Sequence, residues 1–355
     1  MKKQLTVFFI SVLLFTCIIM SITIYMDPFF HYHAPLKGYY YSLDNERSQN
    51  FGITTFWDYD TIITGSSLTQ NYHTTEFDEM FDTRSIKLPF SGATFKETAD
   101  IFKRAYDTGH DLKIVFRSFD VNHLVEDSDY VRTDLGEYPE YLYNDIWWDD
   151  FPYVVNIDIL TDYCIPMIRK RLTHKPGGHT SFNDYMFGEF IPASFAGREA
   201  LPIDNNTVKF TVGDSEILTD NLEKNVLSIA REHPETTFIF FIPPYNIMWW
   251  RDHAVKGELP YVCNVMKRAT VLLLECDNIK LYCFAGRTDL TTNLSLYEDE
   301  YHYISELNGD ILSSIKNNEC LLTKENYIKY FDELENYYKN YDYVTLVNNV
   351  NTADE

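Results

Sequence analysis

The segment from Tyr59 to Leu68 reads YDTIITGSSL and decides which fold we expect. Its first part, Tyr59 to Thr64, is a short β-prone run with Ile62 and Ile63 at its centre, which is typical of a buried strand. The Gly-Ser-Ser that follows is a turn sequence, and a polar, helix-compatible stretch continues to Phe81. The segment therefore predicts a strand that ends in a tight turn and leads towards a helix.

Four further strand candidates follow, and helical patterns separate them. The candidate strands are Arg84–Leu88, Leu112–Phe116, Thr237–Ile242 and Ile279–Phe284. Helices are indicated by capping-box spacing at Thr94-Phe95-Lys96-Glu97, by apolar positions at helical spacing from Leu218 to Ile229, by Pro260 before an apolar-faced segment, and again from about Ile304. Short strands that alternate with helices predict a parallel sheet covered on both faces. We therefore expect an α/β fold, a flavodoxin-like three-layer α/β/α sandwich with a parallel five-stranded sheet.

Two regions depart from this alternation. Residues 137–213 are rich in aromatic side chains, and we interpret them as an insertion that forms a helical cap or a partner surface. Within residues 320–355 we expect an amphipathic C-terminal helix at Lys324–Tyr338, followed by an acidic, frayed tail. The main domain would then run from 59 to 319.

The N-terminal region contains an uncharged apolar run from Leu5 to Tyr25, long enough to cross ~30 Å of hydrocarbon. Two lysines precede it, and the positive-inside rule then keeps the N-terminus cytoplasmic and the main domain extracellular. A cleaved signal peptide is the alternative, but no small-x-small cleavage site follows the run. We expect residues 1–26 to form a cytoplasmic stub with a single transmembrane helix in the cell membrane, and residues 27–58 to be a juxtamembrane segment.

Composition excludes several classes of protein. The 355 residues include 30 basic and 53 acidic side chains, for a net charge of -23. Because a nucleic-acid phosphate backbone requires a basic face, this charge argues against a nucleic-acid-binding protein. A hydrophobic fraction of 45% excludes a disordered chain. The six cysteines show no CxxC spacing and no His/Cys cluster, so we predict neither a metal site nor a cofactor.

Candidate chemistry lies in the loops after the strands, because ligands of open parallel sheets bind at the carboxyl ends of the strands. Ser67 follows the first strand, Gly92 the second and Asp120 the third, whereas Asp299 and His302 follow the fifth. A serine nucleophile needs a histidine base, a carboxylate that orients the base, and N–H donors for the oxyanion. Ser67 would also lie at a helix N-terminus, where the dipole favours negative charge. We interpret Ser67, His302 and Asp299 as a candidate catalytic triad.

These blocks resemble those of the SGNH (GDSL-like) hydrolase superfamily over residues 59–316. Gly65-Ser66-Ser67 is similar to block one, which implies that Ser67 is the nucleophile and that Ser66 lies among the oxyanion or substrate contacts. Gly92 resembles the oxyanion glycine of block two. Asp299-x-x-His302 resembles the block that carries the orienting acid and the base.

Block three departs from the family pattern. The family usually has an asparagine there as a third oxyanion donor, whereas this chain has Arg117-Ser118-Phe119-Asp120. An ionised aspartate would repel an oxyanion. Either Asp120 is protonated, or it orients another group, or the third donor is missing, and Asn122 could replace it.

The anchored N-terminus and the GSS form of block one are similar to a narrower group. It includes the D-alanyl-lipoteichoic acid biosynthesis protein D family and the membrane-tethered SGNH proteins of polysaccharide acetylation, which act beside a membrane-bound O-acyltransferase (MBOAT). The resemblance implies an extracytoplasmic serine acyltransferase or esterase that acts on O-acyl groups of a cell-surface or exopolysaccharide polymer. The alternative is a non-catalytic docking partner of the MBOAT. Asp27 to His33 and Asn45 to Asn50 resemble motifs of uncharacterised Gram-positive members.

Overall fold

The computed structural model describes residues 2–135, 138–184 and 190–353. The chain divides into two compact units, of which the first comprises residues 1–58 and 133–186 and the second residues 59–132 and 187–355. The predicted insertion therefore contributes residues to both units. Its expected first residue, Glu137, lies outside the described residues, as do the last two residues of the predicted tail.

The second unit is built on one five-stranded sheet with the strand order β2-β1-β3-β4-β5. Every neighbouring pair is parallel. The strands are β1 (Thr61–Gly65), β2 (Ser85–Pro89), β3 (Ile114–Ser118), β4 (Thr237–Ile242) and β5 (Ile279–Cys283). This order is that of flavodoxin-like folds. The predicted α/β fold with five parallel strands is confirmed, and the strand ends differ from the prediction by two residues at most.

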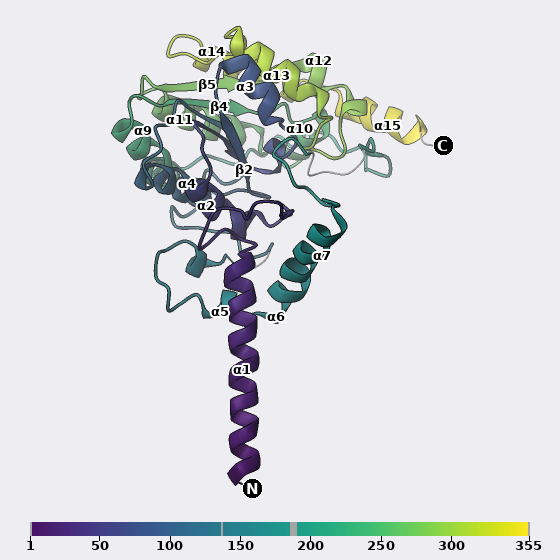
Figure 1. The fold of residues 1–355 in the computed structure, drawn as a ribbon. Coiled ribbons are helices and arrows are strands. Elements are labelled where there is room, and N and C mark those ends of the chain that lie inside the picture. Colours follow the sequence, from purple (N-terminus) through teal and green to yellow (C-terminus); the bar gives the residue numbers. More distant parts are fainter. Residues whose placement is uncertain (1, 136–137, 185–189, 354–355) are drawn as a thin grey trace. The chain divides into compact units, whose positions relative to one another are not determined.

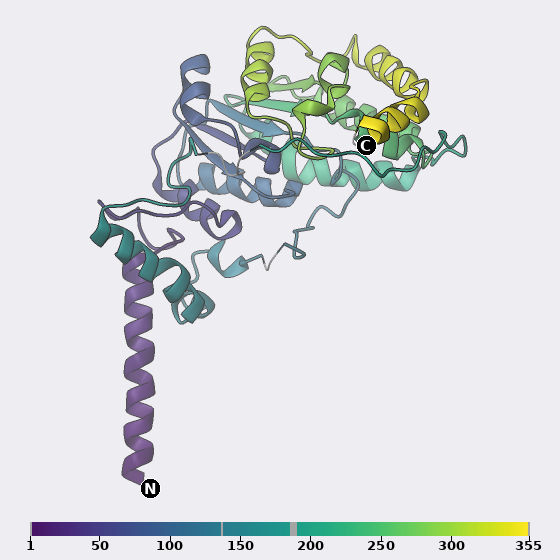
Figure 2. The same ribbon diagram turned by 90° about the vertical axis from the view of Figure 1, so that its right-hand side faces the viewer.

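Helices cover both faces of this sheet, as Figures 1 and 2 show. α3 packs against α13, whereas α4 packs against α9, and α8 packs against α11. Ile62, Ile63, Phe116 and Phe241 in the strands are fully buried, as expected for a sheet with no solvent-facing side. The helices are α3 (Thr74–Phe81), α4 (Phe95–Asp107), α8 (Val212–Leu222), α9 (Ser228–Glu232), α10 (Ile247–Ala254), α11 (Leu259–Leu273), α12 (Thr288–Thr291), α13 (Glu306–Lys316), α14 (Tyr327–Lys339) and α15 (Tyr343–Ala353).

Local sequence signals explain the start of α4 but do not indicate α15. The predicted capping box at α4 is confirmed, because Thr94 Oγ1 accepts the N–H of Glu97 and Glu97 Oε2 accepts the N–H of Thr94. The prediction of a frayed tail is wrong for Tyr343–Ala353, which form α15. Tyr343 and Val347 are buried there, so packing of an apolar stripe stabilises a helix that contains no charged side chain.

The first unit begins with α1 (Lys2–Met26), which is long and apolar enough to cross a membrane by length and composition alone, a property that a signal sequence shares. It continues with α2 (Glu46–Phe56). Its later part contains α5 (Phe151–Val154), α6 (Ile157–Ile159), a π-helical turn η3 (Leu160–Cys164) and α7 (Ile165–Thr173). The last three follow one another without a break.

The turn after α1 is fixed by one buried carboxylate. Asp27 accepts the backbone N–H groups of His31, Tyr32 and His33 at 2.8 to 3.0 Å, and the hydroxyl of Tyr153 at 2.7 Å. The imidazole of His31 and the hydroxyl of Tyr32 both bind Asp150. The Asp27–His33 motif therefore ties the end of α1 to the segment around α5.

Candidate active site

Ser67 lies on the loop that follows β1. Gly65, the last residue of that strand, has φ of +124°, and a Cβ there would collide with the hydroxyl of Ser118, so the position requires glycine. Ser67 then opens a single 3₁₀ turn, Ser67–Thr69. The predicted helix N-terminus is thus only one turn long. Stabilisation of negative charge here depends on individual N–H groups, because so short a helix has little dipole.

Ser67, His302 and Asp299 form one hydrogen-bonded chain. The hydroxyl of Ser67 lies 2.6 Å from Nε2 of His302, and Nδ1 of His302 lies 2.6 Å from Oδ2 of Asp299. Oδ1 of Asp299 accepts the backbone N–H groups of Tyr301 and His302, both at 2.7 Å. This arrangement can move the serine proton to the ring while the carboxylate orients the ring and stabilises its charged form. The structure brings together the three residues of the predicted triad.

The charge of Asp299 follows from these contacts. Burial raises the pKa of Asp299, but hydrogen bonds from the ring and backbone of His302 outweigh burial and hold this pKa below its ordinary value. The carboxylate is therefore ionised at neutral pH, as an orienting acid must be.

Two further contacts position the loop that carries Asp299 and His302. Tyr297 and Tyr303 pair as an antiparallel bridge across this loop. Asn246, which follows β4 and is fully buried, donates from Nδ2 to the backbone carbonyl of Asp299 at 2.7 Å. The oxygen of the Asn246 amide caps α10. Asn246 thus connects the start of α10 to the Asp299–His302 loop.

Two backbone N–H groups, in the loops that follow β1 and β2, form a candidate oxyanion hole. Within residues 2–135, 138–184 and 190–353, the N–H groups of Ser67 and Gly92 have no hydrogen-bond acceptor. Their loops are joined, because Phe90 donates its N–H to the carbonyl of Gly65 at 2.9 Å. Unpaired donors next to a nucleophile are the groups that stabilise a tetrahedral oxyanion.

Gly92 also has a special backbone and a special neighbour. Its φ is +58°, and a Cβ there would collide with Nη1 of Arg132. The guanidinium of Arg132 therefore packs directly on the Cα of Gly92. This places a cation beside the candidate oxyanion hole, where it can attract an anionic substrate group.

Asp120 orients other groups. Its Oδ2 accepts the hydroxyl of Ser118 at 2.9 Å, and its Oδ1 accepts the hydroxyl of Tyr245 at 3.0 Å. The Ser118 oxygen in turn accepts the backbone N–H of Ser66 at 3.0 Å. Of the three alternatives for block three, this geometry favours the second. Asp120 thus connects Tyr245, in the loop after β4, to the backbone next to Ser67 through Ser118.

Ser66 and Asn122 have contacts that differ from a direct role at the oxyanion. Ser66 is buried, and its hydroxyl accepts the N–H of Leu68 at 3.4 Å, which caps the 3₁₀ turn. The amide of Asn122 interacts with the hydroxyl of Tyr301, the residue before His302. The structure thus gives Ser66 a contact within the turn and brings Asn122 to the loop of the base.

A buried cation lies close to Asp120. Burial lowers the pKa of Arg117 to about 10, although the charge of Asp120 raises it, so the guanidinium stays charged at neutral pH. It stacks on the ring of Phe95 at 4.0 Å. Nε and Nη1 of Arg117 have no hydrogen-bond partner in the described part of the chain. Arg117 therefore contributes a fixed positive charge beneath the loops of the site.

A pocket of about 500 Å³ borders the site. Asn122 and Trp249 line it, and both also interact with Tyr301, so the pocket adjoins the loop of His302. Its wall also contains several valines and Tyr261, together with the polar side chains of Lys209, Asp214, His253 and Glu258. Among the described residues, no group of three or more His, Cys, Asp or Glu side chains could hold a metal ion.

Sequence reasoning missed four side chains that shape the site, namely Lys87, Arg132, Tyr245 and Asn246. Lys87 on β2 is buried, and its Nζ donates to the carbonyl groups of Gln70 at 2.6 Å and Tyr72 at 3.0 Å. A lysine within a buried strand is unusual, and this was the one signal in the sequence. The other three have no local pattern that marks them.

No protein-family model and no curated protein matches the chain. A solved structure from Streptococcus pneumoniae, described as a platelet activating factor, is similar to it with 11% identity and a TM-score of 0.39. That similarity covers 77% of this chain and 90% of the other chain.

Proposed function

We propose that this protein is an extracytoplasmic, membrane-anchored serine acyltransferase or esterase of the SGNH type. It would act on O-acyl groups of a cell-surface or exopolysaccharide polymer. The observation that carries the proposal is the hydrogen-bonded chain from Ser67 through His302 to Asp299. These three groups, with two unpaired N–H donors beside the serine, have the roles that acyl transfer requires.

The reaction has two balanced steps. Ser67 Oγ attacks the acyl carbonyl carbon while His302 Nε2 takes the hydroxyl proton, and the N–H groups of Ser67 and Gly92 bind the oxyanion. The bond to the donor oxygen or sulfur breaks, and this leaving group takes the proton from His302. In the second step an acceptor hydroxyl, or water, loses its proton to His302 and attacks the acyl-serine. The Ser67 oxygen leaves and regains a proton.

Location and partner belong to the same proposal. α1 would remain in the membrane, with Lys2 and Lys3 on the cytoplasmic side and both folded units outside. The acyl donor would come from a membrane-bound O-acyltransferase that delivers acyl groups to the outer face. The acceptor would be a glycan or polyol hydroxyl, and the pocket beside Asn122 and Trp249 has room for part of such a substrate.

A non-catalytic docking partner of the same O-acyltransferase is the second candidate. It would need no proton path from the serine. The 2.6 Å contact between Ser67 and His302, with Asp299 behind the ring, favours the enzyme.

Labelling of the full chain with a fluorophosphonate tests the proposal. The wild type should label and Ser67→Ala should not. Ser66→Ala is the matched control and should still label, since its hydroxyl caps the turn and does not contact His302. His302→Ala should label much more slowly, because the nucleophile has lost its base. If cells that carry Ser67→Ala kept full acylation of the polymer, catalysis by this chain would be excluded.

A further inference from the structure

The first unit exposes large apolar side chains on one stretch of chain. Trp147 is 76% exposed, Trp148 70%, Phe151 62% and Leu172 75%. A run of such residues on a water-facing surface is costly, and a cluster of them marks a contact with another apolar phase.

The helical segment from α6 to α7 shows why this exposure is not incidental. Met167 and Cys164 are buried, so one side of the segment already faces the interior of the unit. Ile165, Ile168 and Leu172 follow i, i+3, i+7 spacing on the adjacent side, and all three are exposed. The helix therefore has a second apolar face with no partner among the described residues of its own unit.

Contacts with α1 fix the position of this segment along the axis of α1. α5 and η3 pack against α1, and Ile19, Thr23 and Met26 are the buried residues of that helix. The thiol of Cys164 in η3 lies against Thr23. Ile19 is seven residues before Met26, which corresponds to roughly 10 Å along the helix axis.

That depth lies within the membrane if α1 spans it. A hydrocarbon layer of ~30 Å needs about 20 helical residues, so a span that starts at Leu5 ends near Ile24. α5 and η3 would then cover α1 at the outer edge of the hydrocarbon. In Figures 1 and 2, α6 lies farther towards the N-terminal end of α1 than the end of α7 does. The apolar residues at α5 and α6 are thus the deepest ones.

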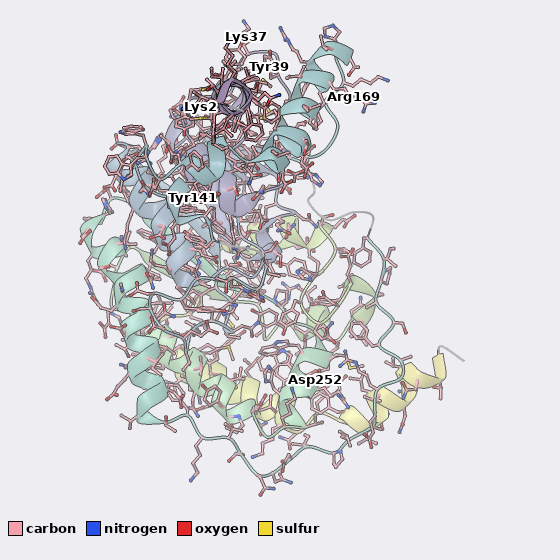
Figure 3. All side chains as sticks on the ribbon, turned by 90° about the horizontal axis from the view of Figure 1, so that it is seen from below. Lys2, Lys37, Tyr39, Tyr141, Arg169 and Asp252 are labelled. Atoms are coloured by element: carbon pink, nitrogen blue, oxygen red, sulfur yellow. The ribbon has the colours of Figure 1, made fainter. Side chains whose placement is uncertain are left out.

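Basic residues lie at the shallow end of the same segment. Arg169 and Lys175 are exposed, and Figure 3 shows Arg169 projecting outward from α7. In a chain with a net charge of -23, such a group stands out from its surroundings. Tryptophans at the level of the headgroups and cations above them are typical of a helix at a membrane surface.

From these observations we infer that residues 146–175 form a membrane-surface element. Its apolar side chains enter the outer leaflet around α1, and its basic residues contact anionic lipid headgroups. The inference rests on the membrane anchor of the proposed function. It adds that the first unit lies in the lipid interface itself, and it commits the exposed face to lipid and not to a protein partner.

The test uses the full chain in vesicles of phosphatidylcholine and phosphatidylglycerol, with acyl chains that are either plain or brominated near the headgroup. Bromine quenches only tryptophans in contact with the chains. The chain has five tryptophans, and the exposed pair Trp147 and Trp148 should lose emission in brominated vesicles. Trp147→Phe/Trp148→Phe should remove this loss, whereas the control Trp57→Phe should keep it. Fluorophosphonate labelling of the double variant should equal that of the wild type.

Flotation of the vesicles separates the inference from the anchor. If the protein floats with the vesicles but its tryptophans remain unquenched and open to iodide, the anchor stands and the membrane-surface element is overturned. The same result is expected if this face binds a protein that the vesicles lack. If the protein does not float, the anchor and the surface element are both overturned, whatever the labelling shows.

Discussion

Replacing Asp120 with asparagine separates two explanations of this residue. If the site simply lacks a third oxyanion donor, Asp120→Asn supplies an amide donor there, and acylation should become faster. A single oxyanion donor is worth about 10²–10³ in rate. If Asp120 instead orients its neighbours, as its contacts with Ser118 and Tyr245 indicate, the same change should be harmful.

The magnitude of the loss follows from the hydrogen bonds. Both carboxylate oxygens of Asp120 accept hydroxyl protons, and asparagine offers one oxygen and one NH₂ group. One of the two hydroxyls, of Ser118 or Tyr245, therefore loses its acceptor while it stays buried. Such a group costs about 1–3 kcal/mol. We expect labelling about 5-fold to 150-fold slower, at roughly 1.4 kcal/mol per factor of ten. The unfolding temperature should fall by about 2 to 12 °C.

The assay is the rate constant of fluorophosphonate labelling, measured beside thermal unfolding for the wild type, Asp120→Asn and Tyr245→Phe. Tyr245→Phe removes one hydroxyl but keeps the charge of Asp120 and its bond to Ser118, so its loss should be smaller. Faster labelling by Asp120→Asn, with an unchanged unfolding temperature, would refute the positioning role. It would then indicate that the side chain at position 120 faces the oxyanion.

Three further changes test other parts of the site. Gly92→Ala forces a left-handed φ on alanine, which costs about 1–2 kcal/mol, and its methyl group collides with Arg132. The unfolding temperature and the labelling rate should therefore both fall. The double variant Gly92→Ala/Arg132→Ala should recover part of the stability. The pKa of Asp299 is lower in the folded state than in the unfolded chain. Its contribution to stability is therefore present above the ordinary carboxyl pKa and is lost as pH falls through the lower folded value. Asp299→Asn should flatten the fall in unfolding temperature at acid pH, and it should slow labelling at pH 7. Asn246→Asp keeps the cap of α10 but removes the donor to Asp299, so it should slow labelling with helix content unchanged, and labelling at the wild-type rate would contradict the positioning role of this amide.

The sheet could be predicted because its signals are local. The strand around Ile62 and Ile63 and the strand Thr237–Ile242 are β-prone runs whose side chains are buried on both faces, so burial and propensity agree. Topology then brought distant loops together. Ser67 and His302 are 235 residues apart in sequence, yet both follow parallel strands, and the carboxyl ends of such strands meet at one edge.

The positioning side chains could not be predicted, because their partners are set by tertiary packing. Tyr245 reaches Asp120 across 125 residues, and Asn246 reaches the Asp299 carbonyl across 53. Neither contact has a sequence spacing that recurs. The helix α15 was not predicted for a related reason. The burial of Tyr343 and Val347 stabilises it, and helix propensity alone does not indicate it.

The contacts of Asp120 also bear on which reaction this site favours. The N–H of Ser66 donates to the hydroxyl of Ser118, and the hydroxyl of Ser66 caps the turn, so in the proposed reaction the oxyanion would be held by the N–H groups of Ser67 and Gly92. With two donors, attack by a weakly held water would gain less stabilisation than it would with three. An acceptor hydroxyl bound in advance beside the acyl-serine compensates through proximity, which water at random orientation does not. Under the proposed function, a site with two oxyanion donors would therefore favour transfer to a bound polymer over hydrolysis.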